Sequence, residues 1–155
     1  MKRVVKKLID LGKTISTMES CTGGYVANEI TCIEGVSEVF QFGAVTYSND
    51  FKIKLGVDAK VIDTYSVYSS ETAREMGKKI AKFANSNYGI GITGKLNRFD
   101  ENNPQGKDNL VFVAIYDRDA DEFYEIEIEV NRSTRRENKE MVYDTIMEKL
   151  LEVLG

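Results

Sequence analysis

The chain has 155 residues, of which 42% are hydrophobic and 30% are charged, and its formal net charge is −4. This length and composition are typical of one globular domain with a core of its own, so we expect a single domain over residues 1–155. The acidic balance disfavours binding to nucleic acid, where a basic face is usual. No apolar run approaches the roughly 20 residues of a membrane span, which disfavours a membrane protein.

The absence of histidine narrows the chemistry further. Within one chain it excludes Ser-His-Asp and Cys-His mechanisms and histidine-ligated metals. A general base must therefore be a lysine, an aspartate, a glutamate or a tyrosine. Cys21 and Cys32 provide neither a disulfide framework nor the spacing of a zinc site. We expect a cytoplasmic protein with free thiols and without a metal or other cofactor.

The first third of the chain alternates between helical and strand patterns. Apolar residues at helical spacing predict a helix over residues 2–11, and a short buried strand follows at 14–18. Residues 22–33 are predicted to be helical, and the β-branched and aromatic stretch 38–47 is predicted to be a strand. A cap signal at 48–50 then opens a short helix that ends at Gly56.

The rest of the chain continues the alternation. We predict one or two helical turns at 58–62, a helix from 69 to about 85, a strand over 88–94 and a polar loop over 95–109. Two strands, 110–116 and 123–130, form a hairpin, and Asn131 is predicted to cap a last helix that runs through Leu154. Interleaved helices and strands favour a three-layer α/β/α sandwich with a mixed β-sheet.

The junction of the first strand and the second helix is the first candidate site. Ser20 follows the strand, and Gly23 and Gly24 precede the helical segment. A strand-to-helix turn presents main-chain N–H groups and suits an oxyanion or a phosphate. The alternative, equally favoured by the local pattern, is that Ser20 or Thr22 only caps the helix.

Two further positions follow strands. Lys52, five residues beyond Tyr47, could reach back over the sheet edge and act as a base if desolvated, although an ordinary surface lysine is the more frequent case. Thr93 and Gly94 end a buried strand, where α/β proteins often contact ligands, although a tight turn explains them equally.

The start of the predicted last helix is rich in cations. On that prediction Arg132 and Arg136 are four residues apart on one helix face and could clamp a phosphate. Arg135 and Lys139 lie in the same two turns. The alternative is a solvated face with ion pairs to neighbouring glutamates.

Four blocks of this sequence resemble the C-terminal domain of CinA, the competence/damage-inducible protein A family. The blocks are Thr-Met-Glu-Ser-Cys-Thr-Gly-Gly at 17–24, Phe-Gly-Ala-Val-Thr-Tyr-Ser-Asn-Asp-Phe-Lys at 42–52, Leu-Gly-Val at 55–57, and Gly-Ile-Thr-Gly at 91–94. The resemblance covers nearly the whole chain in order. Standalone domains of this family are nicotinamide-nucleotide amidohydrolases, also called nicotinamide mononucleotide deamidases.

The resemblance implies hydrolysis of the carboxamide of nicotinamide mononucleotide to nicotinate mononucleotide and ammonia. It implies that Ser20 is the nucleophile, Lys52 its base, and Tyr47 a positioning or proton-relay residue. It also implies a homodimer or a higher homo-oligomer, while the charge and the apolar pattern lead us to expect no nucleic-acid and no membrane partner. The substrate-binding residues expected on this basis are Cys21, Thr22, Gly23, Gly24, Asn49, Thr93, Gly94, Arg132 and Arg136.

One segment departs from the family pattern. Where the family usually has a short Ala-Gly-Pro-Gly-Gly-like loop, this chain has Lys-Leu-Asn-Arg-Phe at 95–99 and a further polar stretch. The segment is expected to lie beside the substrate. A second hypothesis therefore stays open, namely a non-catalytic nucleotide-binding domain that keeps the fold but has lost or changed the substrate loop.

Overall fold

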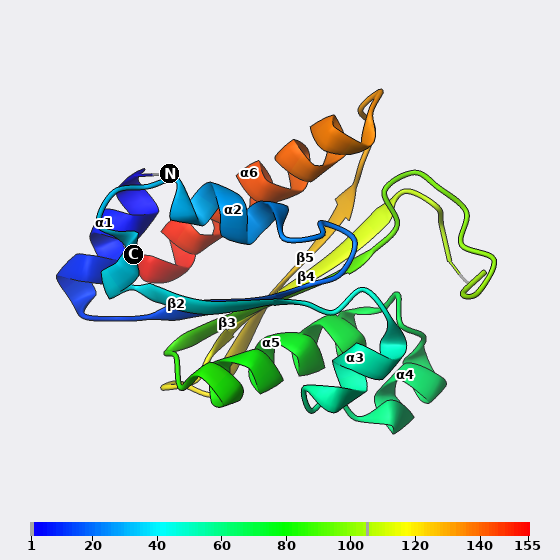
Figure 1. Ribbon diagram of the computed structural model, residues 1–155, viewed down its shortest axis with the longest axis horizontal. Helices are drawn as coiled ribbons and strands as arrows, with labels where there is room; N and C mark the ends of the chain where they lie inside the picture. The colour runs from blue at the N-terminus through cyan, green and yellow to red at the C-terminus, as the bar shows by residue number, and fades with distance from the viewer. Residues whose placement is uncertain (1, 105) are drawn as a thin grey trace.

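In the computed structural model, residues 2–104 and 106–155 are described, and they form one five-stranded sheet between two helical layers (Figure 1). The strands are β1 Ile15–Glu19, β2 Phe40–Val45, β3 Tyr88–Gly94, β4 Leu110–Asp117 and β5 Glu122–Glu129. The helices are α1 Lys2–Leu11, α2 Tyr25–Thr31, α3 Asn49–Lys54, α4 Ala59–Tyr65, α5 Ser70–Ala84 and α6 Arg135–Leu154. The three-layer α/β/α architecture with a mixed sheet is thus confirmed.

The sheet order is β2-β1-β3-β4-β5, with a parallel half and an antiparallel half. Strand β1 is parallel to both β2 and β3, whereas β4 is antiparallel to both of its neighbours, β3 and β5. Glu19, the last residue of β1, is paired with Val45 on one side and Ile92 on the other. The carboxyl ends of the three parallel strands therefore meet at one edge, which is where α/β folds usually carry a site.

Each face of the sheet has its own helical layer (Figure 1). Helices α1, α2 and α6 cover one face, and the larger core lies there, around residues such as Leu8, Ile90 and Ile146. Helix α5, with α3 and α4 at its side, covers the other face (Figure 1). The core on that face is smaller and centres on Met18 and Met76.

Alternation along β3 explains how α5 approaches the sheet so closely. Ile90 and Ile92 point into the larger core, while Gly89 and Gly91 face α5. A Cβ atom at Gly91 would collide with the carbonyl oxygen of Ala73, and one at Gly89 with that of Gly77. The main chains of α5 and β3 therefore touch, and the Gly-Ile-Gly-Ile pattern of the strand is a packing requirement.

The start of the last helix differs from the sequence-based prediction. The helix begins at Arg135, and its N-cap is Thr134, whose hydroxyl accepts a hydrogen bond from the main-chain N–H of Glu137. The side chain of Asn138 accepts from the N–H of Arg132, which holds the preceding segment outside the helix. The prediction that Asn131 caps the helix and that Arg132 and Arg136 share one helix face is therefore wrong.

The other elements lie within a few residues of their predicted bounds, and the largest differences are that α2 begins at Tyr25 instead of residue 22 and that α4 ends at Tyr65 instead of residue 62. No helix among residues 2–104 and 106–155 is both long enough and apolar enough to span a bilayer.

Candidate active site

Ser20 lies at the carboxyl end of β1, in the middle of the parallel half of the sheet. Its N–H donates to the carbonyl of Ile92 at 3.0 Å, and its own carbonyl accepts from the N–H of Gly23 at 2.9 Å. The N-cap of α2 is Gly24, in the left-handed conformation with φ of 95° and without a side-chain cap bond. Ser20 and Thr22 therefore do not cap the helix, which removes the alternative that the sequence left open.

The turn that carries Ser20 is braced by a buried carboxylate. Glu19 is fully buried, and its two oxygens accept from the N–H groups of Val26 and Ala27 in α2 at 3.0 and 2.9 Å. The hydroxyl of Thr22 donates to the same carboxylate at 2.5 Å. Three donors thus compensate a buried charge that would otherwise be costly, and they tie β1 to α2 across the Ser20 turn.

Lys52 comes from the short helix α3, which follows β2. Ser48 caps this helix by accepting from the N–H of Phe51. The side chain of Lys52 is 1% exposed and points back under the sheet edge. Its Nζ lies 3.0 Å from Oγ of Ser20 and donates to the carbonyl of Thr46 at 2.7 Å. The structure therefore brings together the serine and lysine that the sequence singled out.

Burial controls the protonation of Lys52. Desolvation by burial lowers the pKa of Lys52 to about 8. A neutral amine has two N–H donors and one lone pair. With one N–H directed at the carbonyl of Thr46, the lone pair can accept the proton of the Ser20 hydroxyl at 3.0 Å. The arrangement can therefore activate a serine hydroxyl without an imidazole.

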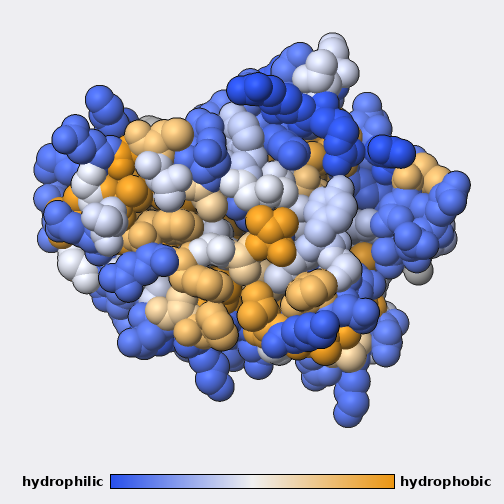
Figure 2. Space-filling view, in the orientation of Figure 1, coloured by the Kyte–Doolittle hydropathy of each residue, from blue (hydrophilic) through white to orange (hydrophobic). Residues whose placement is uncertain are grey.

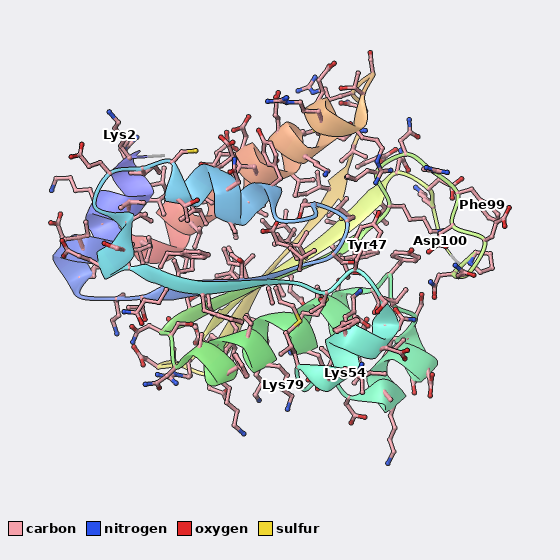
Figure 3. All side chains as sticks on the ribbon, in the orientation of Figure 1. Lys2, Tyr47, Lys54, Lys79, Phe99 and Asp100 are labelled. Carbon is pink, nitrogen blue, oxygen red and sulfur yellow. The ribbon has the colours of Figure 1, made fainter. Side chains whose placement is uncertain are left out.

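Cys21 and Tyr47 flank this pair in different ways. Cys21 is buried, and burial, reinforced by the charge of Glu19, raises the pKa of its thiol to about 12. The thiol is therefore protonated at neutral pH and is a poor rival nucleophile. Tyr47 is 66% exposed at the carboxyl end of β2, where it faces the loop that carries Phe99 and Asp100 (Figure 3).

A cavity of about 960 Å³ opens onto Ser20 and Lys52. Tyr47 and Asn49 line it beside α3, Gly94 lines it at the end of β3, and Cys21 lines it next to Ser20. Its far side is formed by the loop after β3. The hydroxyl of Thr93 is turned away from the cavity and donates to the carbonyl of Val67 at 2.8 Å. Thr93 therefore joins the end of β3 to the segment before α5.

The other expected binding residues lie around the cavity without lining it. Thr22 is buried on Glu19, while Gly23 and Gly24 form the turn behind Ser20. Arg135, the first residue of α6, does line the cavity. Arg136 lies outside the lining, is 84% exposed and pairs with Glu140 at 3.8 Å. Arg132 also lies outside the lining, in the segment before the helix.

Sequence reasoning missed a cluster on the far wall of the cavity. Tyr68 donates a short hydrogen bond to Asp100, which also accepts from the side chain of Asn103 at 3.1 Å. Lys95, only 3% exposed, lies beside them. The sequence had placed the segment that begins at Lys95 beside the substrate, because it follows the Thr93–Gly94 strand end and departs from the family pattern, but it had singled out none of these side chains. Tyr68 gave no signal, since it precedes a helix cap in an otherwise ordinary linker.

No group of three or more cysteine, aspartate or glutamate side chains in the described part of the chain is placed to hold a metal ion.

Taken together, the fold and the site define an α/β domain with a serine and a buried lysine in contact at the carboxyl ends of its parallel strands. The family model described as the CinA C-terminal domain matches residues 1–154. The chain therefore belongs to the CinA C-terminal domain family.

Related sequences and structures agree with this assignment. The chain is 52% identical over 92 residues to a competence-damage inducible protein of Clostridium perfringens, a match that covers 59% of this chain and 22% of that protein. A CinA-like protein of Kosmotoga olearia is 43% identical over 114 residues, which are 73% of this chain and 27% of that protein. The matched region thus spans about a quarter of the length of these curated relatives.

Solved structures match over the whole chain. The competence/damage inducible protein CihA of Agrobacterium tumefaciens is 29% identical, with a TM-score of 0.88, and the match covers 99% of this chain and 93% of that one. A competence or damage-inducible protein of Enterobacter asburiae is 26% identical with a TM-score of 0.87, and the match covers 99% of this chain and 95% of that one.

Proposed function

We propose that this domain is an amidohydrolase that converts the carboxamide of nicotinamide mononucleotide to a carboxylate and releases ammonia. The observation that carries the proposal is the contact of 3.0 Å between Nζ of Lys52 and Oγ of Ser20, with the lysine buried. The family resemblance supplies the substrate. The chemistry follows from the pair itself, because a serine activated by an adjacent base is the usual nucleophile of acyl transfer.

In the proposed first half-reaction, neutral Lys52 takes the proton of Ser20 while Oγ attacks the carboxamide carbon. The tetrahedral intermediate places negative charge on the former carbonyl oxygen, and main-chain N–H groups of the turn after Ser20 are the expected donors to it. Protonated Lys52 then gives its proton to the leaving amide nitrogen. The C–N bond breaks, ammonia departs, and an acyl ester remains on Ser20.

In the second half-reaction, Lys52 is neutral again and takes a proton from water. The hydroxide oxygen attacks the ester carbon, the bond to Oγ breaks, and Ser20 recovers its proton from Lys52. The sum is one amide and one water converted to one carboxylic acid and one ammonia. The cations that line the cavity are candidate partners of the substrate phosphate. Among the arginines near the start of α6, Arg135 takes the role that the sequence analysis gave to Arg132 or Arg136, because only Arg135 lines the cavity.

Ammonia release tests this proposal directly. The purified domain is incubated with nicotinamide mononucleotide, and ammonia and nicotinate mononucleotide are measured together, with Ser20→Ala as the matched inactive control. Equal amounts of both products from the wild type, and none from Ser20→Ala, are expected. Binding of the nucleotide without turnover by the wild type would instead favour a non-catalytic nucleotide-binding domain.

A further inference from the structure

The far wall of the cavity contains a buried cation that the proposed mechanism does not use. Lys95 directly follows β3, lines the same cavity as Ser20 and Lys52, and has a side chain that is 1% exposed. A buried lysine is uncommon and is normally held by specific partners. Because it lines the same cavity as the catalytic pair, its charge is part of what a substrate meets.

Two aromatic rings and the Asp108 carboxylate are among the groups that hold the Lys95 side chain in place. Its Nζ lies 4.9 Å from the ring centroid of Tyr68 and 5.8 Å from that of Phe99, both within the range of cation–π attraction. Asp108, at the other end of the same loop, is 3.5 Å away and about half exposed. The ammonium is thus fixed between two loop ends and two rings instead of moving freely in solvent.

Tyr68 connects this cation to the rest of the wall. Its ring lies against Lys95, and its hydroxyl donates to Asp100. Asp100 also accepts from the side chain of Asn103, and Asn103 accepts from Asn49 of helix α3 at 3.5 Å. The hydrogen bond from Tyr68 lowers the pKa of Asp100, so this carboxylate stays ionised and is engaged within the wall. The wall therefore bridges to the same helix that carries Lys52.

The arginines of the cavity differ from Lys95 in the exposure of their side chains. Arg98 and Arg135 also line the cavity, but both are exposed. Exposed charges are screened by water and lose side-chain entropy on binding, whereas a buried cation that is held in place interacts more strongly with an opposite charge. Lys95 is thus the cation best prepared for an anionic substrate group.

We propose that Lys95 is the specificity-determining residue of this cavity, selecting amides that carry a phosphate group over the same amides without one. The inference rests on the proposed function, because it assigns a role within the same site. A dianionic phosphate carries twice the charge of the Asp108 carboxylate and can compete with it for the Lys95 ammonium. A neutral substrate gains nothing from this cation.

Binding to catalytically inactive protein tests the inference separately from turnover. In a Ser20→Ala background, calorimetry compares nicotinamide mononucleotide with nicotinamide riboside, which has the same amide but no phosphate. Lys95→Met is expected to weaken binding of the mononucleotide by about 10- to 100-fold, the range of one hydrogen bond to a charged group. Binding of the riboside should change by less than about twofold.

Matched variants separate charge from packing. Lys95→Arg keeps the charge and should retain most of the discrimination, and Lys82→Met removes an exposed lysine of α5 and should change nothing. Lys95→Gln replaces the Met variant if that variant does not fold, as judged by circular dichroism. Equal weakening of both ligands by Lys95→Met, or no change in either, would overturn the inference.

Turnover by the wild type distinguishes the two proposals. An active wild type whose phosphate discrimination does not depend on Lys95 rejects the inference alone. An inactive wild type whose nucleotide binding depends on Lys95 rejects hydrolysis alone. If neither ligand binds, both are rejected.

Discussion

Ser20 and Lys52 are 32 positions apart in the chain, and their side chains meet at 3.0 Å because β1 and β2 run parallel and end at the same edge of the sheet. Thr46, the first residue after β2, donates its N–H to the carbonyl of Glu19 and accepts the Lys52 side chain on its own carbonyl. The same few residues therefore join the strands and place the base beside the nucleophile.

Removal of the Ser20 side chain is expected to abolish activity, whereas removal of the neighbouring Cys21 side chain is expected to leave most of it. Ser20→Ala should lower kcat for ammonia release by at least about a thousandfold, since the covalent route is lost. Cys21→Ala should retain activity within about tenfold, because the raised pKa keeps that thiol protonated. Steady-state kinetics of the two variants, with melting temperatures as the folding control, check this. Loss of activity in Cys21→Ala with Ser20→Ala active would identify the thiol as the nucleophile.

The pH dependence of activity should follow Lys52. Since only the neutral amine can accept a proton, kcat/KM is expected to rise about tenfold per pH unit below a pKa of about 8 and to level off above it. Lys52→Arg, which remains protonated, should be inactive across the whole range. A profile that is flat from pH 6 to pH 10 would show that Lys52 is not the base.

The same lowered pKa has a consequence for stability. Lys52 has a pKa of about 8 in the folded protein, against 10.5 in the unfolded chain. Between these values the unfolded state binds more protons, so this residue makes the free energy of unfolding rise with pH. Below about pH 8 the buried charge lowers the free energy of unfolding by up to about 3 kcal/mol, and above pH 10.5 this penalty disappears.

Lys52→Met removes the charge and should therefore gain stability relative to wild type at pH 7, less what is lost with the hydrogen bond to Thr46. That advantage should shrink steadily between pH 8 and pH 10.5. Urea unfolding of both proteins at several pH values measures the difference, and Lys82→Met controls for loss of an ordinary exposed lysine. A difference independent of pH would contradict the burial argument.

Glu19 is expected to matter for both folding and activity. Glu19→Gln turns one acceptor into a donor opposite the N–H groups of α2, which should cost about 1–3 kcal/mol in unfolding free energy. Because the Ser20 turn then loses its brace, kcat should fall by about 10- to 100-fold. Glu34→Gln, at an exposed position, is the matched control. Unchanged kcat would show that the turn is held without the carboxylate.

The expected homo-oligomer has a candidate contact surface on the face that Figure 2 shows. Hydrophobic residues gather there over the edge strand β2 and the helices beside it (Figure 2). Val45 is 52% exposed and Phe83 60%, and Phe42 packs on Phe83 with ring centroids 5.1 Å apart. An exposed apolar edge strand is a usual site of self-association.

We therefore expect the wild type to sediment as a dimer or larger, and Val45→Lys to shift it toward the monomer. Leu11→Lys, at an exposed apolar position of α1, should leave sedimentation unchanged. A monomeric wild type would contradict the expectation of a homo-oligomer.

The sequence was most informative where local patterns determine structure. The alternation of glycine and isoleucine in β3, the Ser48 and Ser69 caps, and the apolar stripe of α5 each indicate their element without tertiary context. Their places after strands made Ser20 and Lys52 candidates and the family resemblance gave them roles, although only the fold could bring them into contact. Burial of Lys52 was beyond local reasoning, since its neighbours in the chain are those of a surface helix.

The start of α6 was misplaced for a physical reason. Asn131 and Thr134 are both good N-cap residues, and the choice between them depends on Asn138, whose side chain binds the N–H of Arg132 from within the helix. Likewise, nothing in the polar segment 95–109 indicates that Lys95 is buried. That outcome depends on Tyr68, which approaches from a distant part of the chain.

The loop that carries Lys95 joins two strands that already pair up to Gly94 and Val111. The pairing of β3 with β4 thus holds the two ends of the loop together. The serine and the lysine base belong to other segments of the chain. Changes of length or composition in this hairpin connection could redirect the preference for one amide over another and leave the hydrolytic chemistry intact. In evolution or in the laboratory, the loop is a part that can be exchanged separately.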